Sequence, residues 1–207
     1  MPKANVYIDG FNLYYGAARG TPYKWLDLSR LCQVMLPGDL IQEIKYFTAR
    51  VSSRPHDPDA PTRQQIYLRA LRTIPNLSIH YGHFLTHSCR MVLTGSSPVQ
   101  KVWVDKTEEK GSDVNLAAHL LRDAYNRRFE VAVLITNDSD LLEPVRIVKD
   151  ELQLPIGILN PHPGRHSKQL QQVATFIKRI RQADLAAAQF PQVVLDSKGP
   201  IHKPATW

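Results

Sequence analysis

The sequence has few cysteines, and it contains neither a long apolar run nor an export signal. Its two cysteines, Cys32 and Cys89, provide no disulfide framework and no metal-binding spacing. No segment approaches the roughly 18 consecutive apolar residues that a membrane-spanning helix needs. The first residues also lack the apolar stretch of a signal peptide. We therefore expect a cytoplasmic protein with reduced thiols and no membrane attachment.

Signatures of nucleotide and zinc sites are missing as well. The glycines at positions 10, 16 and 20 lack the G-x-G-x-x-G spacing of a dinucleotide-binding loop, and there is no P-loop. His80 and His83 stand three apart on an expected strand, so they face opposite sides and cannot share a metal ion. We expect no nucleotide cofactor and no zinc.

What the chain does have is an excess of positive charge. Its 207 residues carry a formal net charge of +7, and the sequence pI is about 9.5. The hydrophobic content of 43% and charged content of 22% are ordinary for a globular protein. This length fits one domain over residues 1–190, followed by a proline-rich C-terminal tail over residues 191–207. The charge favours a polyanionic partner.

Short apolar, β-branched runs alternate with segments of helical periodicity. The expected strands are residues 5–8, 44–51, 77–81, 131–136 and 155–160. The expected helices are residues 27–35, 61–73, 112–125, 139–152 and 168–188, and a break near Ala174 is left open in the last of them. This alternation predicts an α/β fold with a mainly parallel five-stranded sheet flanked by helices. Right-handed crossovers make 3-2-1-4-5 a natural strand order. A turn at residues 95–98 predicts a hairpin over residues 91–105, inserted at the sheet edge.

Aspartates stand at the ends of expected strands or the starts of expected helices. Asp9 closes the first strand, Asp138 and Asp140 follow the fourth, and Asp113 opens the helix at 112–125. Each one alone is explained by helix capping or a turn. In the order 3-2-1-4-5, however, the first and fourth strands are neighbours at the reversal point where α/β sheets bind ligands. Unpaired carboxylates that meet there would repel one another. Oxygen-only ligands suit Mg²⁺ or Mn²⁺, so we expect a shared divalent-metal site.

Three ordered motifs resemble those of the NYN domains, a branch of the PIN-like, metal-dependent ribonuclease superfamily. They are Ile8-Asp9-Gly10-Phe11-Asn12, Lys110-Gly111-Ser112-Asp113-Val114-Asn115-Leu116 and Asn137-Asp138-Ser139-Asp140-Leu141. The similarity runs from about residue 4 to about residue 183. The tail ahead of Trp207 also resembles bacterial members with a stand-alone NYN domain.

The resemblance implies a Rossmann-like PIN fold and a metal-dependent endoribonuclease. Asp9, Asp113, Asp138 and Asp140 would hold Mg²⁺ or Mn²⁺, and Asn12 would line the same pocket. The products would carry a 3′-hydroxyl and a 5′-phosphate. Family members often have Ser or Gly where this chain has Asn137. Whether Asn137 crowds the pocket or supplies another oxygen ligand stays open.

Basic side chains near the same rim are candidates for contacts with substrate phosphates, which position a nucleic acid without reading its sequence. They are Arg50, Arg54, Lys110, Arg165, His166 and Lys168. For each one alone, a solvated basic loop is the favoured explanation. RNA is the expected partner, and self-association into a homo-oligomer is left open.

Two other functions compete with RNA hydrolysis. One is a non-catalytic RNA-binding or regulatory module that retains the NYN fold, because fold does not determine function. The other is a phosphatase with Asp9 as nucleophile, but that chemistry wants a second aspartate where Phe11 stands. The complete acidic set favours the ribonuclease.

Overall fold

A six-stranded parallel sheet forms the centre of the computed structural model, which describes residues 1–164 and 167–207. Its strands are β1 (Lys3–Asp9), β2 (Leu40–Thr48), β3 (Leu77–Tyr81), β6 (Val131–Ile135), β7 (Ile156–Asn160) and β8 (Phe176–Arg179). Their order is β3-β2-β1-β6-β7-β8, and every neighbouring pair is parallel. The predicted α/β class and the predicted order of the first five strands are confirmed.

The sixth strand corrects the sequence prediction, which placed residues 168–188 in a helix and considered only a break near Ala174 within it. The structure divides this segment into α6 (Lys168–Val173), β8 and α7 (Gln182–Ala187). The open edge of β7 accounts for the difference, because it offers backbone partners that a helix cannot use. Thr175 N donates to Ile156 O at 2.8 Å, and the ring of Phe176 lies where a Cβ on Gly157 would stand. Tertiary pairing thus overrides a local helical pattern.

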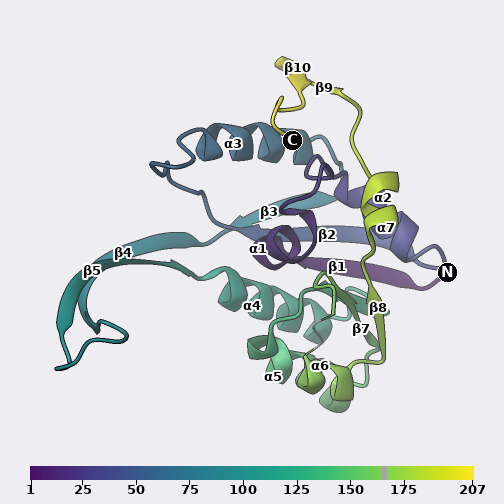
Figure 1. Ribbon diagram of the computed structural model, residues 1–207. Coiled ribbons are helices and arrows are strands. Elements are labelled where there is room, and N and C mark those ends of the chain that lie inside the picture. Colours follow the sequence, from purple (N-terminus) through teal and green to yellow (C-terminus); the bar gives the residue numbers. More distant parts are fainter. Residues whose placement is uncertain (165–166) are drawn as a thin grey trace.

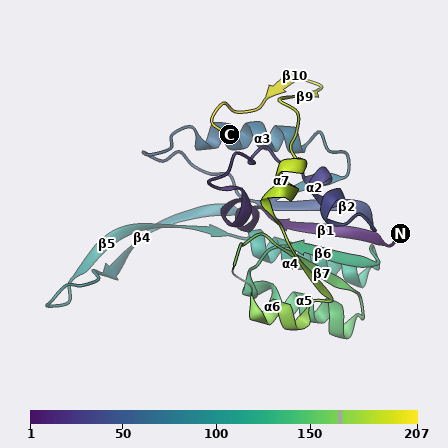
Figure 2. The ribbon, with the colours of Figure 1, turned by 45° about the vertical axis from the view of Figure 1, so that its right-hand side comes forward.

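Helices cover both faces of the sheet (Figure 1 and Figure 2). One face packs against α1 (Gly10–Leu13), the π-helical turn η1 (Tyr14–Ala18), α2 (Leu28–Met35), α3 (Ala60–Leu71) and α7. The other face packs against α4 (Ser112–Tyr125), the 3-10 turn η2 (Ser139–Leu141), α5 (Leu142–Arg146), the π-helical turn η3 (Ile147–Glu151) and α6. The helices predicted at 27–35, 61–73 and 112–125 are present, while the one predicted at 139–152 is divided among η2, α5 and η3.

Two hydrophobic cores lie on the two faces because successive side chains of a strand point in opposite directions. Val6 and Ile8 of β1 belong to the core beneath α2 and α3, and Tyr7 between them belongs to the core beneath α4. The side chains of β1 and β6 that face these cores are almost fully buried. The central strands are therefore held from both sides, and their carboxyl ends have fixed positions.

A long hairpin projects from the sheet between β3 and α4 (Figure 1). It consists of β4 (His83–Val92) and β5 (Lys101–Lys110), which pair only with each other. We call this hairpin the arm. The predicted hairpin exists, but its strands are longer than residues 91–105 and they do not join the central sheet. The sequence did not predict the full length of the two strands. Most of their side chains are exposed on both faces, so apolar and polar residues do not alternate along them.

Residues 191–207, expected as a tail, carry a second hairpin of β9 (Val193–Asp196) and β10 (Gly199–His202). Arg69 of α3 donates from Nε and Nη2 to the Asp196 carboxylate at 2.7 and 2.6 Å. Trp207 packs its ring against Trp25 and Tyr67, with centroids 6.4 and 5.6 Å away. These contacts fasten the segment to α3. Among the described residues, no helix has the length and apolar character needed to cross a membrane.

Candidate metal centre

The carboxyl ends of β1 and β6 form the base of the candidate site. The two strands are direct neighbours, with Ile8 opposite Ile135, so Asp9 and Thr136 come next on adjacent strands. The strand order reverses between β1 and β6, and α/β sheets bind ligands at this position. The sheet therefore places Asp9 where sequence reasoning expects a ligand site.

Asp9 is 6% exposed and is the N-cap of α1. Asn12 N donates to its Oδ1 at 2.9 Å, and the Thr136 hydroxyl donates to its Oδ2 at 3.2 Å. Burial raises the pKa of Asp9 to about 7, and the nearby charges of Asp113 and Asp138 add to this increase. A bound cation would reverse this effect by stabilising the ionised carboxylate.

Asp113 enters the site from the first turn of α4. The helix starts after Gly111, whose φ of 93° lies in the left-handed region that favours glycine. Gly82 permits the close approach of this turn, because a Cβ there would stand 2.5 Å from Lys110 O. Burial raises the pKa of the Asp113 carboxyl, and Asp138, Glu109 and Asp140 raise it further. The same cause thus acts on two of the converging carboxyls.

Asp138 is the N-cap of η2, and its Oδ1 accepts a hydrogen bond from Asp140 N at 3.0 Å. Its own backbone N donates to Thr136 Oγ1 at 3.1 Å. The capping role considered from the sequence is therefore present for both Asp9 and Asp138. Capping does not explain why the two carboxylates share a pocket.

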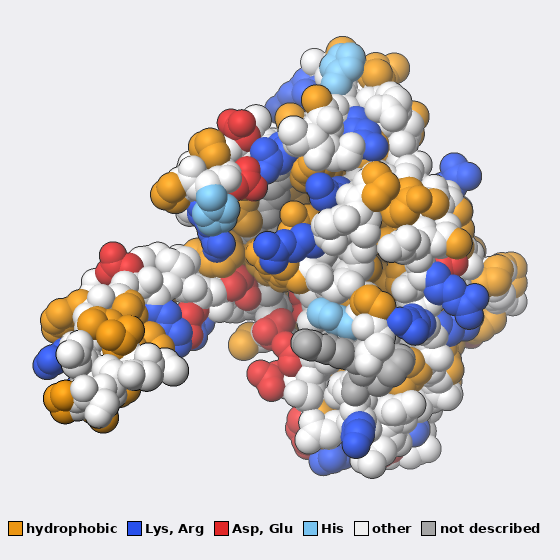
Figure 3. Space-filling model, viewed as in Figure 1, with side chains coloured by type: hydrophobic (Ala, Val, Ile, Leu, Met, Phe, Trp, Pro, Cys, Tyr) orange, Lys and Arg blue, Asp and Glu red, His pale blue; other side chains and the backbone are white. Residues whose placement is uncertain are grey.

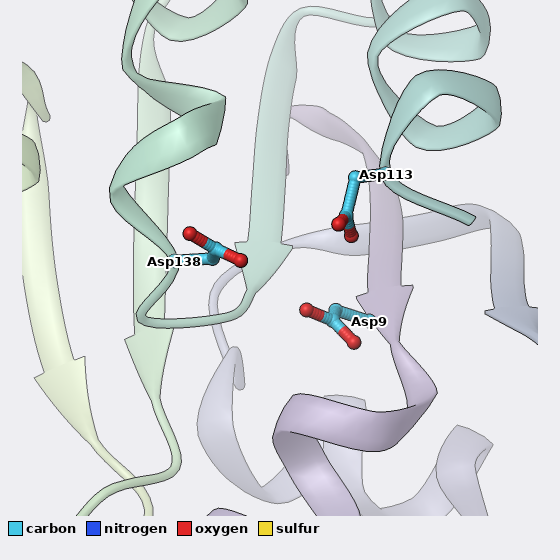
Figure 4. Close-up of side chains that lie close together, drawn as sticks. All are labelled: Asp9, Asp113 and Asp138. Atoms are coloured by element: carbon cyan, nitrogen blue, oxygen red, sulfur yellow. The ribbon is translucent and has the colours of Figure 1, made fainter. Parts of the chain in front are cut away.

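Asp9, Asp113 and Asp138 converge from three elements far apart in the chain (Figure 4). One carboxylate oxygen of each lies within 4.8 Å of the others. None of the ion pairs within residues 1–164 and 167–207 includes any of these three. Close carboxylates without a basic partner, all offering oxygen, fit a hard divalent cation such as Mg²⁺ or Mn²⁺.

The remaining predicted residues lie around this cluster. Asp140 is exposed and stands outside the group of three, although its charge acts on Asp113. Asn12 Oδ1 accepts a hydrogen bond from Asn137 N at 3.0 Å and lies 3.1 Å from His162 Nε2. The Asn137 side chain is engaged elsewhere, because its Oδ1 accepts from Ser167 N at 2.8 Å. Asn137 therefore connects the segment after β6 to Asn12 of α1 and to Ser167 before α6.

A cavity of about 590 Å³ opens beside the three carboxylates. Its walls carry aromatic and basic side chains from several elements. They include Phe11, Tyr14, Tyr15, Phe84, Arg19, Lys24, Arg54, His56 and Arg63. Figure 3 shows acidic side chains in the hollow between the arm and the body, with Lys and Arg on the surface above them. Acidic and basic groups therefore line opposite parts of one opening.

The predicted phosphate-contacting residues are dispersed. Arg54 lines the cavity, whereas Arg50 lies over the ring of Tyr81, 5.3 Å from its centroid, beside a different groove. Lys110 forms an ion pair with Glu108 at 3.1 Å, and Lys168 is exposed at the start of α6. Arg165 and His166 lie outside the described residues.

Sequence reasoning did not single out other residues that line the cavity. Arg19 and Lys24 follow the first helix, and Arg63 belongs to α3, where it pairs with Asp57 at 2.5 Å. Only the tertiary packing of the chain brings these residues to the cavity, so no sequence motif predicted their positions. His162 lies two residues after the end of β7, and this position near a strand end was the one available signal.

Comparisons with known proteins agree with this architecture. The family model of the NYN domain matches residues 3–181, and the chain belongs to the NYN domain family. It is 30% identical to the 6-hydroxy-3-succinoylpyridine 3-monooxygenase HspA of Pseudomonas putida, across 99% of this chain and 75% of that protein. A crystal structure of a protein of unknown function from Vibrio parahaemolyticus is similar with a TM-score of 0.58 and 16% identity. That similarity covers 87% of this chain and 93% of the Vibrio chain, and it shows a shared fold.

Proposed function

We propose that this protein is a metal-dependent endoribonuclease. The observation that supports this proposal best is the convergence of Asp9, Asp113 and Asp138 within 4.8 Å. In this proposal the three carboxylates hold Mg²⁺ or Mn²⁺, and Asp140 acts at the outer rim. When bound, such an ion lowers the pKa of water and offsets the negative charge that develops on phosphate oxygens.

The residues of the chain position the reacting groups. Water attacks the scissile phosphorus, the bond from phosphorus to the 3′ oxygen breaks, and this oxygen takes a proton to become a hydroxyl. The other product keeps a 5′-phosphate. Asn12, held between Asn137 N and His162 Nε2, orients a substrate phosphate at the edge of the cluster. Arg19, Lys24 and Arg54 attract the phosphate chain along the cavity wall.

The test is an RNA cleavage assay with Mn²⁺ or Mg²⁺ on the wild-type protein and three variants. Asp9→Asn and Asp138→Asn should lose cleavage while keeping the fold. Asp150→Asn, at an exposed position of η3, is the matched control and should remain active. Cleavage that survives both Asp9→Asn and Asp138→Asn contradicts the proposal. RNA binding in EDTA without cleavage in either metal supports the alternative of a non-catalytic RNA-binding module.

A second candidate function comes from the Pseudomonas putida relative, which is named as a monooxygenase for a hydroxylated pyridine. The cavity favours this candidate in one respect. Tyr14, Tyr15 and Phe11 present aromatic surface beside Arg19 and Lys24, a combination that suits an aromatic ring bearing a carboxylate. Such a reaction needs O₂ and a two-electron donor. Consumption of 6-hydroxy-3-succinoylpyridine with O₂ and a two-electron donor, together with no cleavage of RNA, would favour this candidate over the nuclease.

A further inference from the structure

Among the described residues, the two strands of the arm pair only with each other, and Phe84 at the base packs its ring against Phe11. The arm is a two-stranded hairpin, and such hairpins are only marginally stable in water when nothing covers them. Large hydrophobic side chains are exposed along it, among them Leu85 and Met91, each 49% exposed, and Trp103, 70% exposed. Several exposed apolar side chains on one projecting element are typical of an interaction site.

The strand register divides the arm into two faces with different chemistry. In an antiparallel pair, directly opposed residues point to the same side. Phe84 and Thr86 therefore share one face with Arg90 and its partner Trp103. The hydroxyls of Thr86 and Thr107, 2.9 Å apart, agree with this assignment. We call this side the tryptophan face.

The opposite side carries Leu85 and Met91 and is the aliphatic face. Met91 stands opposite Val102, which is 38% exposed. This face has no large aromatic side chain. It therefore offers contacts to apolar side chains of a protein, whereas the tryptophan face offers a flat ring.

The tryptophan face is continuous with the candidate active site. Phe84, at the base of the arm, lines the same cavity as Asp9 and Asp113. Arg90 is six residues further along β4, about 20 Å away at the usual rise of ~3.3 Å per residue. A chain that leaves the cavity along this face thus passes Phe84, the threonine pair and the Arg90–Trp103 pair in turn.

The outer part of the tryptophan face has the chemistry of a single-strand nucleic-acid platform. Trp103 is 70% exposed and stands opposite Arg90 in the strand register, and Lys101 stands at the next position of β5 on this face. Proteins that bind single strands combine aromatic rings that stack on bases with cations that follow the phosphates. Asp105, the acidic residue in the middle of this face, accepts a hydrogen bond from the Ser88 hydroxyl.

We infer that the tryptophan face of the arm binds single-stranded RNA that extends from the cavity, with Trp103 stacking on a base and Arg90 and Lys101 contacting phosphates. This inference rests on the proposed ribonuclease function and adds a substrate class to it. Substrates long enough to reach Trp103 gain affinity from the arm. A dinucleotide occupies the cavity alone and gains none.

The experiment compares wild-type protein with Trp103→Ala, Trp103→Phe and Met91→Ala. Binding of a long single-stranded RNA is measured in EDTA, and cleavage of the long RNA and of a dinucleotide is measured with Mn²⁺. Trp103→Ala should weaken binding of the long RNA by roughly 5-fold to 100-fold, the effect of losing one stacked base. Trp103→Phe should retain most of the affinity. Met91→Ala, on the aliphatic face, should match the wild type, and dinucleotide cleavage should be unchanged throughout.

Each other outcome has a distinct meaning. Unchanged long-RNA binding and cleavage in Trp103→Ala overturn the arm inference and leave the ribonuclease proposal intact. Long-RNA binding that depends on Trp103 without any cleavage supports the arm and contradicts the ribonuclease. Absence of RNA binding in the wild type overturns the arm inference outright. If sedimentation shows a wild-type oligomer that Trp103→Ala and Met91→Ala both dissociate, the arm binds a second copy of the chain and the RNA assignment is wrong.

Discussion

The Thr136 hydroxyl donates a hydrogen bond to the Asp9 carboxylate, with 3.2 Å between Oγ1 and Oδ2. Thr136 Oγ1 also accepts a hydrogen bond from Asp138 N at 3.1 Å. Thr136 is fully buried directly after β6, so one hydroxyl connects the Asp9 carboxylate to the backbone of Asp138. This residue positions the cluster without being one of its proposed ligands.

Replacement of Thr136 by valine keeps the shape and removes the hydroxyl. Asp138 N and one Asp9 oxygen then lose a partner in a buried place, which costs about 1–3 kcal/mol of the free energy of unfolding. Urea unfolding measures this loss, and calorimetric titration with Mn²⁺ should show weaker binding. Thr136→Ser retains the hydroxyl and should stay close to the wild type in both measurements. Equal behaviour of the valine and serine variants contradicts the positioning role.

Asp9 should make the metal-free protein less stable as the pH rises. The pKa of this carboxyl is raised by burial from 3.8 to about 7, so the folded state holds its proton more tightly than the unfolded chain. The contribution of Asp9 to the free energy of unfolding therefore decreases between about pH 4 and pH 7 and is lowest above that range. In EDTA, Asp9→Asn should remove this dependence and unfold at a higher temperature than the wild type at pH 8.

Addition of Mn²⁺ should reverse the order of stability, because the wild type gains a ligand-bound folded state and Asp9→Asn does not. Thermal unfolding with and without Mn²⁺ at pH 8 measures both effects. Parallel pH profiles of metal-free stability for the wild type and Asp9→Asn from pH 4 to pH 8 contradict the assigned burial of the charge. An equal gain with Mn²⁺ in both proteins contradicts the role of Asp9 as a ligand.

Gly10 should not tolerate a side chain. A Cβ at this position would lie 2.7 Å from both the Phe47 carbonyl oxygen and the Tyr46 ring, at the junction of β1 and α1. Gly10→Ala must displace that junction, so we expect a loss of about 1–3 kcal/mol in the free energy of unfolding. Mn²⁺ affinity should fall too, because Asp9 is the adjacent residue. Gly38→Ala is the control, since a Cβ there meets no atom within 4 Å.

His80 should make the protein sensitive to acid. Its ring stacks on Phe47 with centroids 5.0 Å apart, and it contacts the ring of His119 at 4.1 Å. Burial and the neighbouring His119 lower the pKa of His80 from 6.5 to about 4. The unfolded chain therefore binds the proton more tightly, and stability present above about pH 6.5 is lost as the pH falls toward 4.

His80→Gln should lose part of this dependence between pH 7 and pH 5, as measured by urea unfolding at each pH. His87→Gln, at an exposed position on the arm, should keep the wild-type dependence. Identical pH profiles for His80→Gln and the wild type would show that the histidine stack is not responsible.

The sequence predicted the centre of the fold well because its signals there are local and strong. The run at 131–135 is apolar throughout and becomes a buried strand, and right-handed crossovers leave few other orders. β8 was missed because Phe176 and Ile177 also fit a helical spacing, and only the free edge of β7 decides between the two. The arm was underestimated because a strand exposed on both faces carries no alternation.

In the candidate site too, the residues that could be predicted are those whose positions follow from the strand order. Asp9 and Asp138 stand at strand ends, where topology determines their neighbours, and the structure brings them together with Asp113. Asp140 lies two residues after Asp138 and is turned outward by the helical path of η2. Loop residues are harder, because strand order does not determine where a loop goes: Arg54 reaches the cavity and Arg50 does not.

Crystals soaked in Mn²⁺ and measured at the manganese absorption edge provide the most direct test of a shared cation. The account predicts an anomalous density peak between the carboxylates of Asp9, Asp113 and Asp138, which disappears in crystals of Asp9→Asn. Crystals that show no peak there at saturating Mn²⁺, or a peak only at other carboxylates such as Asp150, would contradict it.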